Sequence, residues 1–224
     1  MILPTSYSTS LNDIDKALMS LPSDEPGKQT INQPTGDFFY DPWEIKPEYK
    51  GTVWEQLLND LGEIKGEARV ITLTSKSNYV SHCDIDDRFH LNLSGEFCYL
   101  IDLNTDTMYP TRKDGIWYSI DTSKLHTAAN FGNIYRHQLV VRKLLTHCRI
   151  KEPIDITIFP VIDNLDSARF LFDHRISPLL NSANKQKLID NFKLINARPT
   201  FTCEYSFVSV LKNAIGPELK IEVI

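Results

Sequence analysis

Ionisable side chains are concentrated between Ser81 and Leu93, where the sequence reads SHCDIDDRFHLNL. His82 and Asp84 are two residues apart, and an extended chain places side chains at that spacing on the same face. A metal site needs at least one further ligand from a distant strand. His126 precedes another predicted strand and is suitably placed. Two histidines and one carboxylate are the facial ligand set of non-haem iron(II) oxygenases.

Basic residues follow both parts of this candidate ligand set. Arg88 and His90 share one face of the strand after the first pair, and Arg136 opens a strand ten residues after His126. If 2-oxoglutarate is the cosubstrate, its keto-acid end chelates the iron and its far carboxylate needs a cation. Arginine suits this role because its guanidinium binds a carboxylate through two parallel hydrogen bonds. We expect Arg136 to hold the far carboxylate, with Arg88 and His90 adding positive charge beside the cosubstrate.

The surrounding sequence alternates in hydrophobicity with a period of two from Ala68 to about Leu145. Turn signals such as SGE, NTDT and RKDG separate short β-branched or aromatic runs. Several short strands at this spacing predict an all-β barrel or sandwich, of which the jelly roll is one form. The predicted strands are ARVITLTS, RFHLNLS, EFCYLIDL, GIWYSID and RHQLVVRKLL.

Helical patterns lie on either side of this β region. Thr52 and Glu55 form a capping box that begins a predicted helix over residues 53–65, whose apolar face should pack on the core. Residues 1–50 predict an irregular arm with one helix, NDIDKALMSL. Residues 151–224 predict a small α+β extension, with amphipathic helices over 165–180 and 183–196 and strands over 201–211 and 219–224. The β domain should therefore span residues 51–150.

Composition excludes several classes of protein. The net charge of −5 argues against a nucleic-acid binder. No apolar run approaches the roughly 18 residues that cross a bilayer. The N-terminus lacks a basic segment followed by a long apolar one, so no signal peptide is expected. The four cysteines show no CxxC spacing and are expected to be reduced thiols of a cytoplasmic protein.

The order of the candidate site residues resembles a known family. HCD at 82–84, RFHL at 88–91 and HTAAN at 126–130 with Arg136 downstream are similar to motifs of the aspartyl/asparaginyl β-hydroxylases. These are 2-oxoglutarate/iron(II) dioxygenases, and free-proline cis-hydroxylases belong to the same group. The resemblance covers residues 68–145. It implies a double-stranded β-helix (a cupin-like jelly roll), with iron bound through His82 and His126.

The resemblance also implies how the cosubstrate is held and where this chain departs from the family. Residues matching Arg88, His90 and Arg136 hold 2-oxoglutarate. The animal aspartyl hydroxylases lack a metal carboxylate and have a longer spacing from the first metal histidine to the arginine. Here Asp84 supplies the carboxylate, as in the bacterial proline hydroxylases. This departure leaves the chemistry intact and puts a peptidyl-aspartate substrate in doubt.

Other polar residues in these motifs have simpler explanations. Asp86 and Asp87 are predicted to be solvated turn residues, and His137 is predicted to be a surface or hydrogen-bonded core residue. Cys83 should face away from the metal. Asn92 begins the glycosylation pattern NLS, but its place in a predicted strand argues against modification.

Three functions remain open at this point. The first is a dioxygenase that hydroxylates an unactivated C–H bond of an amino acid or a peptidyl residue and releases succinate and CO₂. The second is a non-catalytic jelly-roll protein that binds a small anion. The third is a zinc hydrolase with the same three ligands, which zinc would accept, although zinc gives no reason for Arg136. The sequence does not identify the substrate or the oligomeric state.

Overall fold

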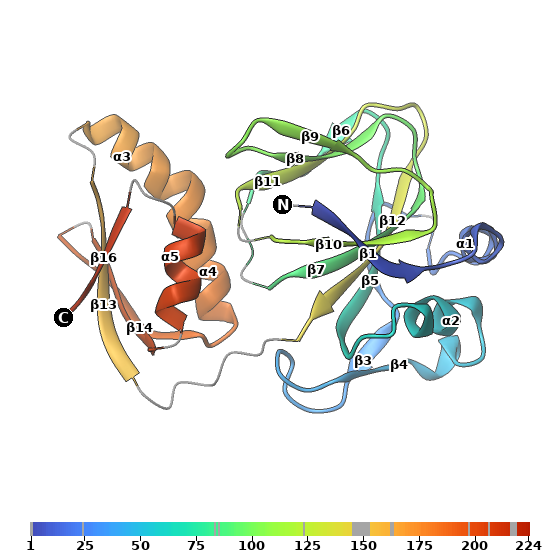
Figure 1. The fold of residues 1–224 in the computed structure, drawn as a ribbon, viewed down its shortest axis with the longest axis horizontal. Helices are drawn as coiled ribbons and strands as arrows, with labels where there is room; N and C mark the ends of the chain where they lie inside the picture. The colour runs from blue at the N-terminus through green and yellow to red at the C-terminus, as the bar shows by residue number, and fades with distance from the viewer. Residues whose placement is uncertain are drawn as a thin grey trace. The chain divides into compact units, whose positions relative to one another are not determined.

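Antiparallel β-strands make up most of the regular structure in the computed structural model of the chain (Figure 1). The structure describes residues 2–23, 25–82, 84, 86–122, 124–144, 153–161, 164–196, 198–205, 207–215 and 219–224. Two compact units are present. The first consists of residues 1–80, 86–122 and 126–145, and the second of residues 81–85, 123–125 and 146–224. The predicted mainly β class is confirmed.

A six-stranded antiparallel sheet dominates the first unit. Its strand order is β1-β10-β7-β12-β5-β2. The central strands coincide with runs whose alternation predicted them. The six strands are β1 (Ile2–Ser8), β2 (Gly27–Thr30), β5 (Lys65–Leu73), β7 (Arg88–Ser94), β10 (Ile116–Ile120) and β12 (Arg136–Lys143).

The two edge strands of this sheet come from the segment predicted as an irregular arm. β1 pairs with β10, placing Ile2 opposite Ile120, and β2 pairs with β5, placing Gln29 opposite Val70. Ladder hydrogen bonds to existing strands order these segments although their own composition is polar and rich in turn residues. Residues 1–50 are therefore an integral part of the first unit, and the structure shows no boundary near residue 50.

A second, four-stranded sheet completes the β structure of this unit. Its order is β6-β11-β8-β9, with β6 (Ser77–Asn78), β8 (Cys98–Asp102), β9 (Thr107–Pro110) and β11 (His126–Asn130). His126 is thus the first residue of a strand. A short hairpin, β3 (Asn32–Pro34) and β4 (Trp43–Ile45), leads into the 3₁₀ helix η1 (Pro47–Tyr49).

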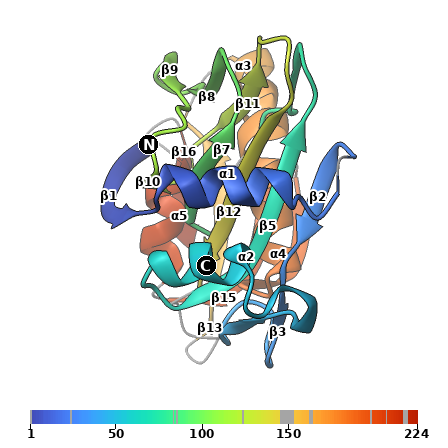
Figure 2. The same cartoon turned by 90° about the vertical axis from the view of Figure 1, so that its right-hand side faces the viewer.

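Two helices pack with the six-stranded sheet. α1 (Leu11–Met19) and α2 (Val53–Asp60) lie on one side of its strands, and α1 crosses them in Figure 2. The Ser10 and Thr52 hydroxyls cap them by accepting backbone N–H groups. Glu55 accepts from the Gly51 N–H, so the predicted capping box closes one residue earlier than expected. Both helices bury apolar side chains in the main core, among them Ile14, Ala17, Trp54, Leu57 and Leu61.

Alternation along the central strands separates this core from a polar face. The odd-numbered apolar residues of β7 and β12 join the core: Phe89, Leu91, Leu93, Leu139 and Val141. The even-numbered residues point the other way and are mostly polar: Arg88, His90 and Asn92 on β7, and Arg136, Gln138 and Arg142 on β12. Register aligns Asn92 with Gln138 and Arg88 with Arg142. The sheet therefore presents a row of buried polar side chains on the face away from α1 and α2.

The second unit contains a four-stranded antiparallel sheet and helices. Its strand order is β14-β15-β13-β16, with β13 (Pro153–Pro160), β14 (Ile189–Ile195), β15 (Arg198–Glu204) and β16 (Leu219–Val223). The helices are α3 (Leu165–Leu171), the π-helical turn η2 (Phe172–Ile176), α4 (Ser177–Lys185) and α5 (Phe207–Ile215).

Two element predictions in this unit are wrong. Residues 189–195 form strand β14, although a helix was predicted over 183–196. Lys187 and Asn191 have left-handed backbone conformations, which interrupt a helix, and pairing with β15 then decides the structure. Residues 207–215 form helix α5 instead of a strand. Phe207, Val208, Leu211 and Ile215 are buried and fall on one helical face.

Within the described residues, no helix combines the length and the apolar character needed to cross a membrane.

Candidate metal and anion site

The three predicted metal ligands lie together. His82, Asp84 and His126 each offer one ligand atom, and these atoms lie within 4.8 Å of one another. The Nε2 atom of His82 is 3.3 Å from Oδ2 of Asp84. His126 is buried, whereas the side chain of His82 is 38% exposed, so the cluster reaches solvent on one side. The structure thus brings together the three residues that the sequence analysis selected, and the metal itself stays a prediction.

Backbone contacts explain how residues distant in sequence meet. Tyr79 donates its N–H to the Ala128 carbonyl at 3.0 Å and accepts from the Thr127 hydroxyl at 2.6 Å. These bonds attach the chain beside β11 only three residues before His82. Asp86, buried in the first unit, lies two residues after Asp84. Tyr79 and Asp86, which precede and follow this segment in the sequence, both belong to the first unit.

Arg136 has an environment that a charged side chain rarely tolerates. It is 2% exposed, and its Nη2 donates to the Gln138 side-chain oxygen at 2.7 Å. Its Nε is buried without a hydrogen-bond partner, and Arg136 forms no ion pair with any described residue. Burial lowers the pKa of its guanidinium, yet arginine stays protonated in proteins. A buried guanidinium that is hydrogen-bonded only to a neutral amide is a suitable binding site for an anion, because an anion would compensate its charge.

A short chain of amides extends this site along the polar face. The Gln138 amide nitrogen donates to Oδ1 of Asn92, and both side chains are buried. Gln138 thus orients its oxygen toward Arg136. The Asn92 oxygen accepts this hydrogen bond, and among the described residues its Nδ2 donates to no partner. The buried position of Asn92 agrees with the expectation that it is no glycosylation site.

His90 is the second residue with unused hydrogen-bonding capacity. Both ring nitrogens are buried and have no partner among the described residues. Burial holds the pKa of His90 well below its usual range, and the charges of Arg136, Arg88, His126 and Arg69 act in the same direction. His90 is therefore a neutral imidazole near neutral pH. It can donate one hydrogen bond and accept another.

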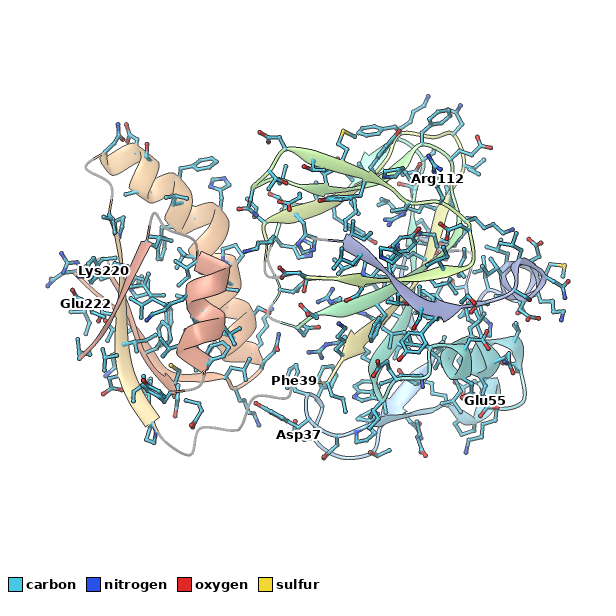
Figure 3. All side chains as sticks on the ribbon, in the orientation of Figure 1. Asp37, Phe39, Glu55, Arg112, Lys220 and Glu222 are labelled. Atoms are coloured by element: carbon cyan, nitrogen blue, oxygen red, sulfur yellow. The ribbon has the colours of Figure 1, made fainter. Side chains whose placement is uncertain are left out.

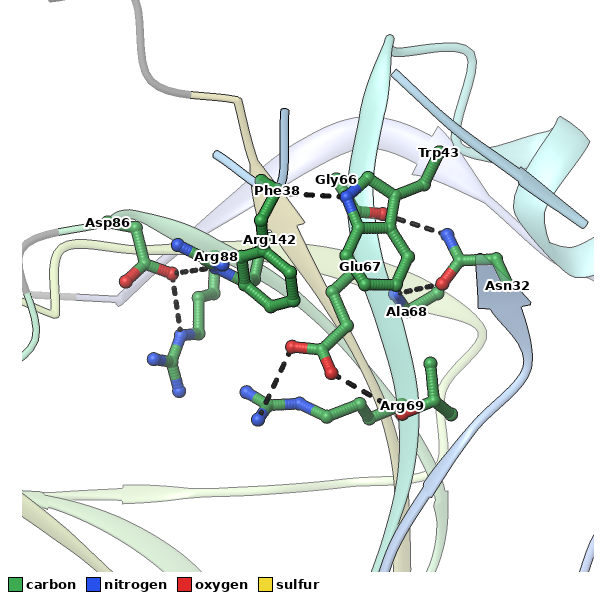
Figure 4. A network of polar contacts seen from close by, with 11 residues as sticks. Asn32, Phe38, Trp43, Gly66, Glu67, Ala68, Arg69, Asp86, Arg88 and Arg142 are labelled. Carbon is green, nitrogen blue, oxygen red and sulfur yellow. Dashed lines mark hydrogen bonds and ion pairs between the residues drawn. The ribbon is translucent and has the colours of Figure 1, made fainter. Parts of the chain in front are cut away.

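Arg88, the third predicted cosubstrate residue, takes part in an ion-pair network (Figure 4). Oδ2 of Asp86 accepts from Nε of Arg142 at 2.7 Å and from Nε of Arg88 at 3.2 Å. Asp86 is 2% exposed, so its prediction as a solvated turn residue is wrong. Asp87 is exposed, as predicted. The difference arises because Asp86 neutralises arginines of two neighbouring strands, a pairing that period and composition do not reveal.

Aromatic rings from the loop between β3 and β4 cover part of this network. The Arg142 guanidinium carbon lies 5.2 Å from the ring centre of Phe38 and 4.7 Å from that of Phe39. The Trp43 indole N–H donates to the Phe38 carbonyl at 3.1 Å. Asn32 anchors the hairpin, because its side chain bonds Gly66 O and Ala68 N of β5 (Figure 4).

Arg69 is a further cation on the same face, and the sequence analysis did not select it. Its Nη1 lies 3.5 Å from Oε2 of Glu67, and its buried Nε has no hydrogen-bond partner in the part of the chain that the structure describes. The sequence feature that could have identified Arg69 is its position inside the apolar run ARVITL, where an arginine must lie on the less apolar face of the strand. Among the described residues, the ion pairs of the four arginines on this face (69, 88, 136 and 142) that are resolved here use two carboxylates, Glu67 and Asp86.

The remaining polar motif residue, Asn130, has a structural role. It is fully buried, and its Nδ2 donates to the Thr74 and Ile134 carbonyls at 2.9 and 2.8 Å. Its Oδ1 accepts from the Gly132 N–H. These bonds hold the turn between β11 and β12 and thereby set the spacing between His126 and Arg136. His137 on the opposite strand face contacts the Thr72 hydroxyl, as expected for a hydrogen-bonded residue. Cys83 lies outside the described residues.

No protein-family model matches the chain, and a search of curated proteins finds no match. The resemblance to the β-hydroxylase family therefore stays a prediction that depends on the residues themselves.

Proposed function

We propose that the chain is a 2-oxoglutarate- and iron(II)-dependent dioxygenase that hydroxylates an unactivated C–H bond of an amino acid or a peptidyl residue. The observation that carries this proposal is Arg136, which lies on the same sheet face as His90 and is a buried cation without a counter-ion among the described residues. The three ligand residues alone would suit zinc as well. Their combination with a buried arginine that no described carboxylate neutralises suits an anionic cosubstrate.

The donor atoms fit iron(II). Two imidazole nitrogens and one carboxylate oxygen within 4.8 Å of one another form the ligand set of a facial triad, contributed by His82, Asp84 and His126. Iron bound there together with 2-oxoglutarate would supply the activation of O₂ and the oxidation of the C–H bond, with succinate and CO₂ as the other products. The protein would supply binding, orientation and a dry environment.

Arg136 is assigned to the distal carboxylate of 2-oxoglutarate. Its buried Nε and its remaining guanidinium hydrogens offer the fork that two carboxylate oxygens accept. Gln138 fixes the plane of the guanidinium from behind through the 2.7 Å hydrogen bond. His90, neutral and with both nitrogens available, can donate to a carboxylate oxygen without adding charge. Arg88 would act at the edge of the cosubstrate, since Asp86 already accepts from its Nε.

The architecture of the first unit supports the same proposal. A six-stranded and a four-stranded antiparallel sheet share a small apolar cluster that contains Leu100, Ala128 and Ile120. The main core lies on the other side of the six-stranded sheet with α1 and α2. We infer a double-stranded β-helix whose polar interior carries the site, as dioxygenases of this class require.

The test combines a turnover assay with paired variants. Purified protein is incubated with iron(II), 2-oxoglutarate and O₂ across a panel of free amino acids and peptides. Succinate is quantified, and a gain of one oxygen is sought by mass spectrometry. His126→Ala should abolish iron binding and turnover while leaving a cooperative fold. His174→Ala, which changes an exposed histidine of the second unit, is the control.

A second pair of variants examines the anion site separately. Arg136→Ala should weaken 2-oxoglutarate binding roughly 30- to 4,000-fold, the loss that follows from truncating one partner of a buried charged pair. Its affinity for iron should be nearly unchanged. Arg112→Ala, at an exposed arginine labelled in Figure 3, should do neither. If the parent protein binds iron but no 2-oxoglutarate in calorimetry, the dioxygenase proposal fails and a hydrolase becomes the better hypothesis.

A further inference from the structure

The second unit, which the proposed function does not use, contains a cavity of about 560 Å³. The cavity lies between one end of the four-stranded sheet and the segment that runs from α3 into η2 (Figure 1). Pockets that bind small molecules usually measure about 300–1,000 Å³. All four strands contribute apolar residues to one wall, and the helical segment supplies the other: Ile158, Leu194, Pro199 and Leu219 from the sheet, and Ala168, Phe172 and Ile176 from the helices.

Strand register determines which side chains face the cavity. Leu194 is paired with Pro199, and both lie on the sheet face of the buried Ile158, which the helices cover. Phe159 and Arg198 also border the cavity, but alternation along their strands points their side chains to the opposite face. There the guanidinium carbon of Arg198 lies 5.3 Å from the centre of the Phe159 ring. The charge of Arg198 is therefore directed away from the cavity.

The helices of the second unit differ in how closely they pack on the sheet. α4 lies against β14 and α5 against β15, and they bury Leu179 and Leu211 respectively. None of the α3 side chains that the structure describes is buried. Between α3 and α4, the Ser177 N–H donates to the Phe172 carbonyl five residues earlier, which defines the π-helical turn η2. Such turns occur frequently at functional sites, and Phe172 and Ile176 of this turn both line the cavity.

The polar side chains of the lining do not create a charged interior. Nε of Arg169 lies 3.7 Å from Oδ2 of Asp173, and these side chains are 82% and 53% exposed. They therefore lie at the mouth of the cavity and neutralise each other. Asn196, at the turn between β14 and β15, is exposed as well. Among the described lining residues, those that are buried or half-buried are all apolar.

We propose that the second unit binds a neutral, apolar small molecule in this cavity. Protein interiors are normally close-packed, so side chains around an unfilled cavity lose dispersion contacts that an apolar ligand would restore. An apolar cavity of about 150 Å³ already accepts benzene, so this one has room for a medium-length alkyl chain or for fused aromatic rings. A charged ligand would gain little here, because Arg169 and Asp173 already neutralise each other. The proposal is independent of the metal and anion site in the first unit.

Three probes with the same alkyl chain test the class of ligand: octan-1-ol, octanoate and octylammonium. Each is titrated calorimetrically into the full chain without metal or 2-oxoglutarate, so the outcome does not depend on the proposed function. We expect octan-1-ol to bind with a dissociation constant below about 1 mM. Both charged probes should bind roughly tenfold more weakly, because their head groups lose hydration without gaining a partner. No binding of octan-1-ol, or tighter binding of octanoate, would overturn the proposal.

Variants that fill the cavity from opposite walls test where the probe binds. Ala168→Phe acts from α3 and Leu219→Phe from β16, and each should weaken octan-1-ol binding at least about tenfold through crowding. Ser167→Phe, at the exposed neighbour of Ala168 that does not line the cavity, is the matched control and should bind like the parent. Scanning calorimetry without ligand identifies the variants that fold, and either cavity variant suffices. Parent-like affinity in a folded cavity variant would show that octan-1-ol binds elsewhere, and the inference would be overturned.

Discussion

Replacing Asp86 by asparagine should destabilise the first unit more than any other single carboxylate change near the site. Asp86 is 2% exposed, and the side chains of Arg142 and Arg88, which it bonds through one oxygen, are 7% and 13% exposed. Asparagine keeps the shape and one acceptor but removes the negative charge that Asp86 offers to both arginines. Breaking a buried ion pair from one side costs about 3–5 kcal/mol. With a urea m-value of about 2 kcal/mol/M, the midpoint should fall by roughly 1.5–2.5 M.

The chain provides both the probe and the control for this measurement. Its three tryptophans, at positions 43, 54 and 117, all belong to the first unit, so their fluorescence reports the unfolding of that unit. Asp87→Asn is the matched control. The Asp87 carboxylate is 48% exposed and lies 3.9 Å from the Lys143 amine, so its removal should cost less than about 1 kcal/mol. Equal midpoints for the two variants would refute the reasoning, because they would show that Asp86 is as solvated as its neighbour.

The other predictions concern the anion pocket. Arg136→Lys should recover only part of the 2-oxoglutarate affinity lost in Arg136→Ala, measured by calorimetry, because lysine offers a point charge without the fork. The depressed pKa of His90 means that the unfolded chain takes up a proton below about pH 6.5 while the folded protein does not. The parent should therefore lose up to about 1.4 kcal/mol of stability per pH unit relative to His90→Gln as the pH falls from about 6.5, in urea titrations followed by tryptophan fluorescence. Gly95→Ala should destabilise the protein and weaken 2-oxoglutarate binding, since Gly95 has φ +126° and a Cβ there would lie 2.7 Å from Cys98 Sγ and 3.3 Å from Arg136 Cβ. Gly27→Ala, with φ +135° but nothing within 4 Å, separates backbone strain from this crowding in the same thermal and binding measurements.

Strong periodicity was sufficient to predict the central strands and the first two helices. β7 (Arg88–Ser94) coincides with the run RFHLNLS, and α2 begins after the predicted cap at Thr52. These elements bury one face against a single core, so their apolar residues recur in the sequence with the period of a strand or a helix. β14 was mistaken for a helix because its apolar spacing fits both periods. Left-handed residues and pairing with β15 decide such a case, and neither is visible in a window of the chain.

The candidate site shows the same division between local and distant information. Two residues at i and i+2, or a histidine and an arginine flanking a turn, are local patterns, and the structure brings His82, Asp84 and His126 together. The partner of Asp86 could not be found in this way. Arg142 is 56 residues away and becomes its neighbour only through the register of β7 and β12. Arg69 was missed for a related reason, since what distinguishes it is a buried Nε without a partner among the described residues.

The distribution of charge on the polar face gives these separate observations a common physical reason. Arg88, Arg142 and Arg69 each have a carboxylate within ion-pairing distance, so their burial is compensated. Arg136 alone among these four arginines has none within the described residues, and it is the least exposed residue of β12 that carries a charge. A sequence selected only for stability would replace it by an apolar residue, because uncompensated burial of a cation costs several kcal/mol. Its presence on the same sheet face as His90, whose ring nitrogens also lack partners among the described residues, is accounted for if a ligand with a negative charge restores the missing interactions when it binds. At a ligand concentration of about 100 times the dissociation constant, that binding would stabilise the fold by about 2.7 kcal/mol. The ligand would thus offset much of the cost of burying Arg136.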